Sequence, residues 1–303
     1  MTEESAVLID GPWTHRTVSA AGTRFHVAEA GEGPLVLLLH GFPQFWWSWH
    51  GQLVALAAAG YRAVAVDLRG YGASDKPPRG YDLITLASDA AGLIRALGEG
   101  DAIVAGHSSG GLLAWTMATY FPKSVRRLVV LSMPHPLRLR GALATSGQAW
   151  AGRHLLGFQV PMLPERRLVA DDAARVAEML HTWSRPGWPD PATERHVRDA
   201  FQIPGVAHSA LEFHRWLFRS QVRPDGRRYM RRMRRPIGVP TLHVHGAMDT
   251  YLLPAAARGS GRYVGAPYLW RLITGAGHFP HQEQPERVNS TLIGWLDETG
   301  PDT

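Results

Sequence analysis

The sequence predicts an α/β fold in which helices cover both faces of a mostly parallel sheet and a helical segment is inserted. Short, continuously apolar runs alternate with helical stretches up to residue 131, which is typical of parallel strands buried on both faces. The alternation stops between about residues 134 and 236 and then resumes. A glycine-flanked serine also lies where one apolar run meets a helix.

Each expected element follows from its local pattern. Alternating apolar and polar residues before position 30 predict edge strands that are split by a turn at 21–22. Buried strands are expected at 35–39, 62–66, 102–105, 127–131, 241–245 and 269–273. Helices are expected at 46–59, at 83–97, from the glycines after 105 to about 120, and at 288–296.

The interruption between 134 and 236 contains helical patterns broken by prolines and no short buried strand. We therefore expect an α/β core domain formed by residues 1–134 and 237–303. A helical cap domain, residues 135–236, is expected to be inserted into it.

Composition restricts the class of protein. The 303 residues include no cysteine, which excludes disulfides, thiolate metal ligands and a cysteine nucleophile. No apolar run reaches the roughly 18 residues that a membrane span needs. The N-terminus carries acidic residues where a signal peptide would carry basic ones. We expect a soluble, cytoplasmic protein with a small-molecule substrate and no membrane, metal or cofactor.

The net charge of +6 has a local origin, because the segment 215–235 contains nine arginines and one acid. Arg215, Arg219 and Arg223 are spaced to share one helix face. Such a cluster could bind anions or nucleic acid. The interpretation we favour is a solvated helix face, since no nucleic-acid motif accompanies the arginines.

The motif that carries chemistry is Gly106-His-Ser-Ser-Gly110, which fits G-x-S-x-G between a buried strand and a helix. A sharp turn there exposes the Ser108 hydroxyl as a nucleophile and directs the Ser109 N–H toward a developing oxyanion. The alternative, a phosphate-binding turn, lacks the lysine and the glycine spacing of such loops. Phe42 is the expected second oxyanion donor, because Pro43 has no N–H.

A serine nucleophile needs a base and a group that orients the base. Asp249 and His278 each follow a late predicted strand, where open α/β sheets place their sites. The alternative position for the acid, residues 132–135, contains no carboxylate. His281 is the rival base, but it lies three residues farther from its strand than His278.

With these residues in place, the sequence resembles the epoxide-hydrolase branch of the α/β-hydrolase family across nearly the whole chain. The matching segments are 40–49, with Gln44 where the family usually has Glu, and 67–77, 158–165, 211–215 and 275–285. The resemblance implies an α/β-hydrolase fold with a cap over the site.

The departures from the family concern the reacting groups. Epoxide hydrolases of this branch have Asp followed by Trp where this chain has Ser108 and Ser109. An aspartate opens an epoxide to an ester, which water can hydrolyse, whereas a serine would form an ether with no carbonyl to attack. Ser108 therefore predicts substrates that bring their own carbonyl group.

By the same alignment, His154 and His214 stand where the family has two ring-opening tyrosines. They could bind or protonate a substrate, or they could be ordinary cap residues. Trp46 is expected to line an apolar pocket together with these two histidines.

We therefore predict a serine hydrolase that acts on a carboxylic ester or lactone through an acyl-enzyme. One alternative is an epoxide hydrolase-like enzyme, in which His278 and Asp249 activate water and the cap histidines act as acids. A C–C or thioester hydrolase and a non-catalytic binding protein are the others.

Overall fold

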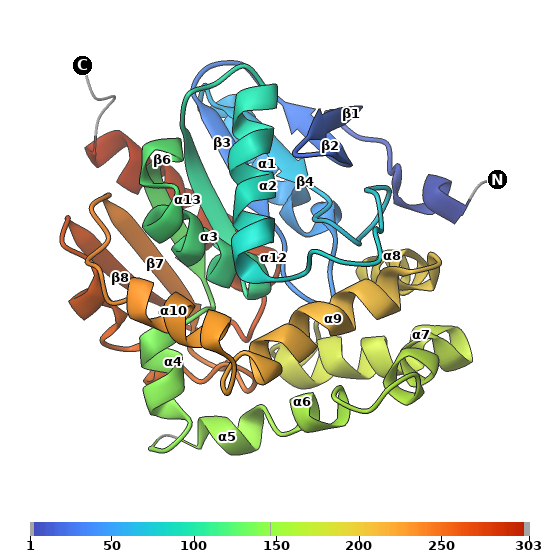
Figure 1. The fold of residues 1–303 in the computed structure, drawn as a ribbon. Helices are drawn as coiled ribbons and strands as arrows, with labels where there is room; N and C mark the ends of the chain where they lie inside the picture. Colours follow the sequence, from blue (N-terminus) through green and yellow to red (C-terminus); the bar gives the residue numbers. More distant parts are fainter. Residues whose placement is uncertain (1–2, 146, 300–303) are drawn as a thin grey trace.

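The computed structural model describes residues 3–145 and 147–299, and its centre is an eight-stranded sheet (Figure 1). The strand order is β1-β2-β4-β3-β5-β6-β7-β8. β2 pairs antiparallel with β1 and β4, and the other neighbours pair parallel, so the predicted mostly parallel sheet is confirmed. The strands are β1 (Thr14–Ala20), β2 (Thr23–Ala30), β3 (Leu35–Leu39), β4 (Arg62–Val66), β5 (Ala102–His107), β6 (Val125–Leu131), β7 (Thr241–Gly246) and β8 (Tyr268–Ile273).

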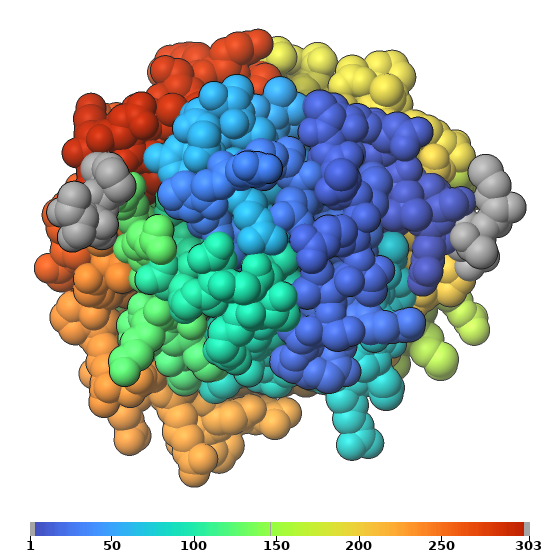
Figure 2. Space-filling model, turned by 90° about the horizontal axis from the view of Figure 1, so that it is seen from above, coloured from blue at the N-terminus to red at the C-terminus, as the bar shows by residue number. Residues whose placement is uncertain are grey.

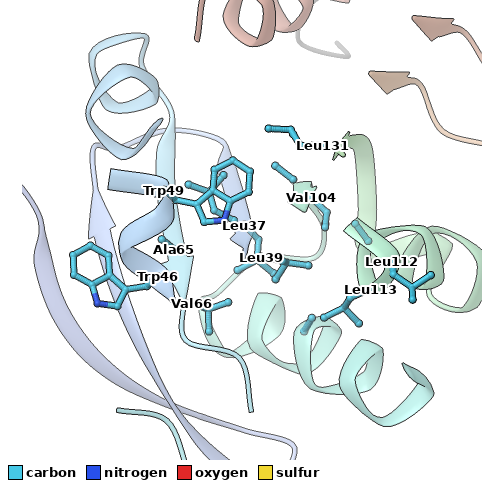
Figure 3. Packing of buried hydrophobic residues seen from close by; sticks show 14 of the residues in the cluster. Leu37, Leu39, Trp46, Trp49, Ala65, Val66, Val104, Leu112, Leu113 and Leu131 are labelled. Carbon is cyan, nitrogen blue, oxygen red and sulfur yellow. The ribbon is translucent and has the colours of Figure 1, made fainter. Parts of the chain in front are cut away.

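The core lies where the central strands meet the helices on either side. All five residues of β3 are buried, as its continuous apolar run predicts. Figure 3 shows Leu37 and Leu39 of this strand in one cluster with Val104 of the adjacent strand β5, Leu131 of β6 and Leu113 of helix α3 (Ser109–Tyr120). Full burial of one such leucine stabilises the fold by about 1.5–3 kcal/mol. The sheet is thus a rigid support for the loops at its carboxyl edge.

Helices cover both faces of this sheet. On one face α2 packs against α3, and on the other α1 packs against α13 (Figure 1). The bounds are α1 (His50–Ala58), preceded by a 3-10 turn at Trp46–Trp49, α2 (Leu83–Ala96), α3 (Ser109–Tyr120), α11 (Pro254–Ala257), α12 (Pro280–Glu283) and α13 (Pro285–Glu298). The Asp82 carboxylate accepts the N–H groups of Ile84 and Thr85 and so begins α2.

Between β6 and β7 the described residues form helices without a strand. These are α4 (Pro136–Ala142), α5 (Gln148–Ala151), α6 (His154–Gly157), α7 (Leu163–Trp183), α8 (Pro191–Gln202), α9 (Val206–Arg219) and α10 (Pro224–Arg232). They lie beyond one edge of the sheet in Figure 1, and from above their yellow and orange segments appear only at the periphery (Figure 2).

The arginine-rich segment does not form the single helix face that its spacing predicts. α9 ends at Arg219, and Arg223 precedes α10, because Pro224 starts a new helix. Arg215 is buried and donates to Glu165, Glu212 and two backbone carbonyls. Arg215 therefore holds segments of the cap together rather than forming part of a solvated surface. In the described part of the chain, no helix is long and apolar enough to cross a membrane.

Candidate active site

The serine of the G-x-S-x-G motif sits in the strained turn that the motif predicts. Ser108 joins β5 to α3 with φ 51° and ψ −120°, a conformation that costs a non-glycine residue about 1–3 kcal/mol. The flanking glycines are required by space. A Cβ at Gly106 would overlap the carbonyl oxygen of Gly110, and a Cβ at Gly110 would overlap that of Leu39. The turn presents Ser108 at the N-terminus of α3.

Asp249 and His278 meet at the carboxyl edge of the sheet. Asp249 follows β7 and His278 follows β8, and His278 Nδ1 lies 2.8 Å from Asp249 Oδ2. The other carboxylate oxygen accepts the N–H groups of Tyr251 and Leu252, each at 2.9 Å. Since a carboxylate only accepts hydrogen bonds, Nδ1 carries the proton and Nε2 of the neutral ring is a base.

The basic nitrogen of His278 is not occupied by another protein group. Nε2 is buried and has no hydrogen-bond partner among residues 3–145 and 147–299. Ser108 Oγ and Nε2 do not hydrogen-bond in this structure, and such catalytic contacts often form only with substrate. Asp249 and His278 are therefore in contact, and Nε2 of His278 is free to accept a proton.

The surroundings of Asp249 keep it ionised. Burial alone would raise the pKa of this carboxyl, but electrostatic attraction to His278 and hydrogen bonds from His245 and His278 outweigh it and bring the pKa to about 2. The role of His245, whose Nε2 lies 3.3 Å from Asp249 Oδ2, was not predicted from the sequence. Its position four residues before Asp249, at the end of the same strand, is the signal that could have indicated it.

A second carboxylate holds the histidine loop in place. Glu283 accepts the N–H groups of Gly277, Phe279 and Arg185 at 2.7–2.9 Å. Burial raises the pKa of Glu283, although these hydrogen bonds act in the opposite direction. The carbonyl of His278 also lies 2.7 Å from Nε2 of His107. The backbone around the base is thus fixed on both sides.

The rival histidine, His281, does not contact the acid. It is fully buried, its ring lies 4.5 Å from that of Trp49, and neither ring nitrogen has a partner in the described residues. The geometry therefore places His278, rather than His281, beside Asp249.

The two expected oxyanion donors are adjacent, but one is already engaged. The Phe42 N–H donates to the Ser109 side-chain oxygen at 3.0 Å. The ring of Phe42 packs against the rings of His214 and Phe201, at 4.8 and 5.8 Å between centroids. Ser109 therefore contributes its hydroxyl to the expected oxyanion hole as well as the backbone N–H that the motif predicts.

A cavity of about 410 Å³ extends from Ser108 into the space beneath the cap. Ser109, His214 and Tyr251 also line it, and the rest of the lining is mostly leucine, methionine and aromatic residues. Tyr251 was not predicted, although it lies only two residues after the expected acid. Its ring lies 4.9 Å from that of His278 and stacks on Trp183.

Trp46 does not line this cavity, so its assignment to the substrate pocket was wrong. The ring is completely buried against Trp13, and its Nε1 donates to the carbonyl of Val7 at 2.7 Å. Figure 3 shows Trp46 on the opposite side of Val66 from the cavity-lining Leu112. The presence of a tryptophan in the motif does not show whether its ring faces the core or the cavity.

The two cap histidines lie near each other, but only His214 lines the cavity. His154 packs against Phe158, Trp183 and Tyr251. Burial lowers the pKa of both histidines to about 4, with the neighbouring His214 adding to the effect at His154. Both rings are therefore neutral at pH 7.

The tautomer of His214 follows from its partner. Its Nδ1 lies 2.8 Å from the carbonyl oxygen of Ala210, which can only accept, so Nδ1 carries the proton. Nε2 of the neutral ring is then a hydrogen-bond acceptor toward the cavity. Among the described residues, no group of three His, Asp or Glu side chains is placed to hold a metal ion.

Comparison with known proteins agrees with this architecture. A family model described as the alpha/beta hydrolase fold matches residues 34–285. Epoxide hydrolase 3 of Xenopus tropicalis is 33% identical over 92% of this chain and 76% of its own length. The AB hydrolase superfamily protein YfhM of Bacillus subtilis is 31% identical over 92% and 96%. The crystal structure of epoxide hydrolase A from Mycobacterium thermoresistibile superposes with a TM-score of 0.82 at 30% identity, over 94% of this chain and 98% of that one.

Proposed function

Because this chain belongs to the α/β-hydrolase fold family and is a hydrolase, we propose that it cleaves a carboxylic ester or lactone through an acyl-enzyme on Ser108. The observation that carries the proposal is a serine in the strained turn after β5, at the edge of the sheet where Asp249 orients His278. Residues 1–134 and 237–303 would form the catalytic core domain, and residues 135–236 the cap over it.

In the proposed reaction, His278 Nε2 removes the proton of Ser108 as Oγ attacks the substrate carbonyl carbon. Asp249 stabilises the resulting imidazolium, and the N–H groups of Ser109 and Phe42 stabilise the oxyanion. The imidazolium then protonates the leaving alcohol, and the acyl group remains on Ser108. A water molecule, deprotonated by His278, hydrolyses this ester and releases the acid.

The cap histidines support a carbonyl substrate over an epoxide. Opening an epoxide requires an acid that protonates the ring oxygen, and a neutral histidine whose free nitrogen is an acceptor does not supply that proton. The lowered pKa of His154 and His214, about 4 for each, removes this role at neutral pH. His214 Nε2 is instead suited to accept a hydrogen bond from a substrate hydroxyl or water.

An epoxide hydrolase-like activity is the second candidate, and the comparisons favour it over an ester or lactone. Several relatives at about 30% identity are named epoxide hydrolases. In this mechanism His278, oriented by Asp249, would activate water directly against an epoxide carbon. Ser108 would then be a bystander, and His154 and His214 would have to act as acids. Thioester or C–C bond hydrolysis would use Ser108 in the same way as an ester.

The two candidates differ in what they require of Ser108. The protein is treated with a fluorophosphonate, the labelled residue is identified by mass spectrometry, and p-nitrophenyl butyrate and styrene oxide are assayed side by side. The proposal expects ester turnover that is abolished by labelling of Ser108. Epoxide turnover that survives the labelling, without ester turnover, would establish the second candidate instead. Inertness to the label combined with tight ligand binding would indicate a non-catalytic binding protein.

A further inference from the structure

The cap contains a surface of unusual composition, residues 136–145 and 147–164, which we name the outer cap strip. It comprises α4, which packs against the core helix α11, then α5 and α6, which lie far from the sheet in Figure 1, and the start of α7. Its sequence contains three arginines and neither aspartate nor glutamate. The whole region 135–236 carries 18 arginines against nine acids, whereas the complete chain has a net charge of only +6.

The outer cap strip also exposes large apolar side chains. Thirteen such side chains are exposed in the described part of the chain, and six of them belong to the strip. Trp150 is 72% exposed and is the one exposed tryptophan among the described residues. The six are Leu143, Trp150, Leu156, Val160, Met162 and Leu163. Single exposed apolar residues are ordinary, but a gathering of this kind marks an interaction surface.

This surface is continuous with the mouth of the cavity that leads to Ser108. Leu143 and Leu156 of the strip, and Phe218 of α9, line the cavity and are at least half exposed to solvent. The charged residues of the lining are Arg140 and Arg153, both from the strip. The opening of the cavity is thus surrounded by apolar groups and guanidinium groups, with no carboxylate in its lining.

The two arginines at this mouth lack acidic partners. The side chain of Arg140 has no ion pair or hydrogen bond within the described ranges, and the guanidinium of Arg153 donates to the Trp150 carbonyl and lies 4.3 Å from the centre of the Trp150 ring. Tryptophan and leucine beside arginine are the side chains that bind where acyl chains meet anionic headgroups. A symmetric contact between two copies would bring arginines against a strip that has no carboxylate, which disfavours self-association.

We propose that the outer cap strip docks on an anionic lipid surface, with the mouth of the cavity against the bilayer. The apolar substrate would then enter from the lipid phase rather than from water. This identification of the substrate route rests on the proposed function, whereas the docking itself does not. It departs from the expectation that the protein has no membrane partner, and it requires surface binding only, without a spanning helix.

Co-sedimentation with vesicles tests the docking. The full-length protein is mixed with vesicles of phosphatidylcholine alone, or of phosphatidylcholine with 30% phosphatidylglycerol, at low and high salt. We expect binding to the anionic vesicles that is at least about ten-fold stronger and that weakens with salt. Brominated lipid should quench part of the tryptophan fluorescence, and the quenched part should be absent in Trp150→Phe.

Variants locate the contact. The double variant Trp150→Asp, Met162→Asp should lose vesicle binding while its turnover of a water-soluble ester stays unchanged, since neither side chain lines the cavity. Val54→Asp, at an exposed apolar position on α1, is the matched control and should bind as the wild type does. Arg140→Gln combined with Arg153→Gln should remove the preference for anionic lipid.

Three results would overturn the proposal. The first is that the wild type and the Trp150→Asp, Met162→Asp variant bind both vesicle types equally, and the second is that the wild type binds neither type. The third is lipid-independent self-association in the ultracentrifuge that these substitutions abolish, because the occupant would then be a second copy. Ser108→Ala should bind vesicles as the wild type does. Vesicle binding therefore tests the docking independently of the proposed catalytic function.

Discussion

The backbone N–H of Phe42 donates to the hydroxyl oxygen of Ser109 at 3.0 Å, across a sequence separation of 67 residues. Phe42 and Ser109 are the two expected donors of the oxyanion hole. The N–H of Phe42 is already bonded to the side chain of Ser109, whose own backbone N–H is the second donor. Any oxyanion that binds Phe42 N–H directly must first displace this hydroxyl. We therefore expect the side chain of Ser109 to affect how well the site stabilises an oxyanion, and hence kcat/KM.

Removing the Ser109 hydroxyl tests this competition. Breaking a protein hydrogen bond typically costs about 0.5–1.5 kcal/mol. We therefore expect Ser109→Ala to raise kcat/KM for an ester by roughly two- to ten-fold. Ser109→Thr keeps the hydroxyl and should behave as the wild type does. A fall in kcat for Ser109→Ala would show instead that the hydroxyl itself donates to the oxyanion.

The assignment of the base can be checked with two neighbouring histidines. His278→Asn should reduce kcat by roughly 10⁴-fold or more, as is typical when a member of such a catalytic set is lost. His281→Asn should retain most of the activity, because His281 makes no contact with Asp249. Steady-state kinetics with a soluble ester, together with circular dichroism as a control for folding, make the comparison. Comparable losses in both variants would contradict the assignment of His278 alone.

Glu283 is predicted to be a positioning residue for the histidine loop. Its Oε2 accepts the N–H groups of both Gly277 and Arg185. In Glu283→Gln one oxygen becomes an amide donor that opposes N–H groups, at a cost of about 1–3 kcal/mol in stability. We expect a lower melting temperature and a kcat reduced by roughly ten-fold or more, with little change in KM. Glu286→Gln, exposed on α13, is the control and should change neither quantity.

The lowered pKa of the two cap histidines, His154 and His214, predicts that the fold is less stable in acid. Their folded-state pKa of about 4 lies below the ordinary value of 6.5, so between these values the unfolded chain binds more protons. Stability is therefore fully present above pH 6.5 and is lost as the pH falls toward 4, by at most roughly 3 kcal/mol for each group.

Denaturant unfolding at several pH values measures this loss. Replacing His154 and His214 together by Asn should flatten the decline between pH 6.5 and 4, whatever the variant's stability at pH 8. An unchanged slope would show that other groups carry the acid sensitivity.

Much of the fold and part of the site could be predicted from local patterns. The apolar run 35–39 and the glycines around Ser108 depend on neighbours in sequence, and both strand β3 and the strained turn are present. Asp249 and His278 could be selected because the ends of parallel strands meet at one edge of a sheet. The arginine spacing failed as a guide, because Pro224 begins a new helix within the segment.

What the sequence by itself determined, then, is the order of the elements, the nucleophile turn and the chain positions of the acid and the base. Tertiary structure alone decided that Asp249 pairs with His278, that Trp46 packs away from the cavity, and that the Ser109 hydroxyl meets Phe42. It also decided the protonation of the cap histidines, since burial sets their pKa. The physical reason is range. Backbone geometry and hydrophobic periodicity act over a few residues, whereas burial and hydrogen-bond partners depend on segments that are distant in sequence and meet only when the chain has folded.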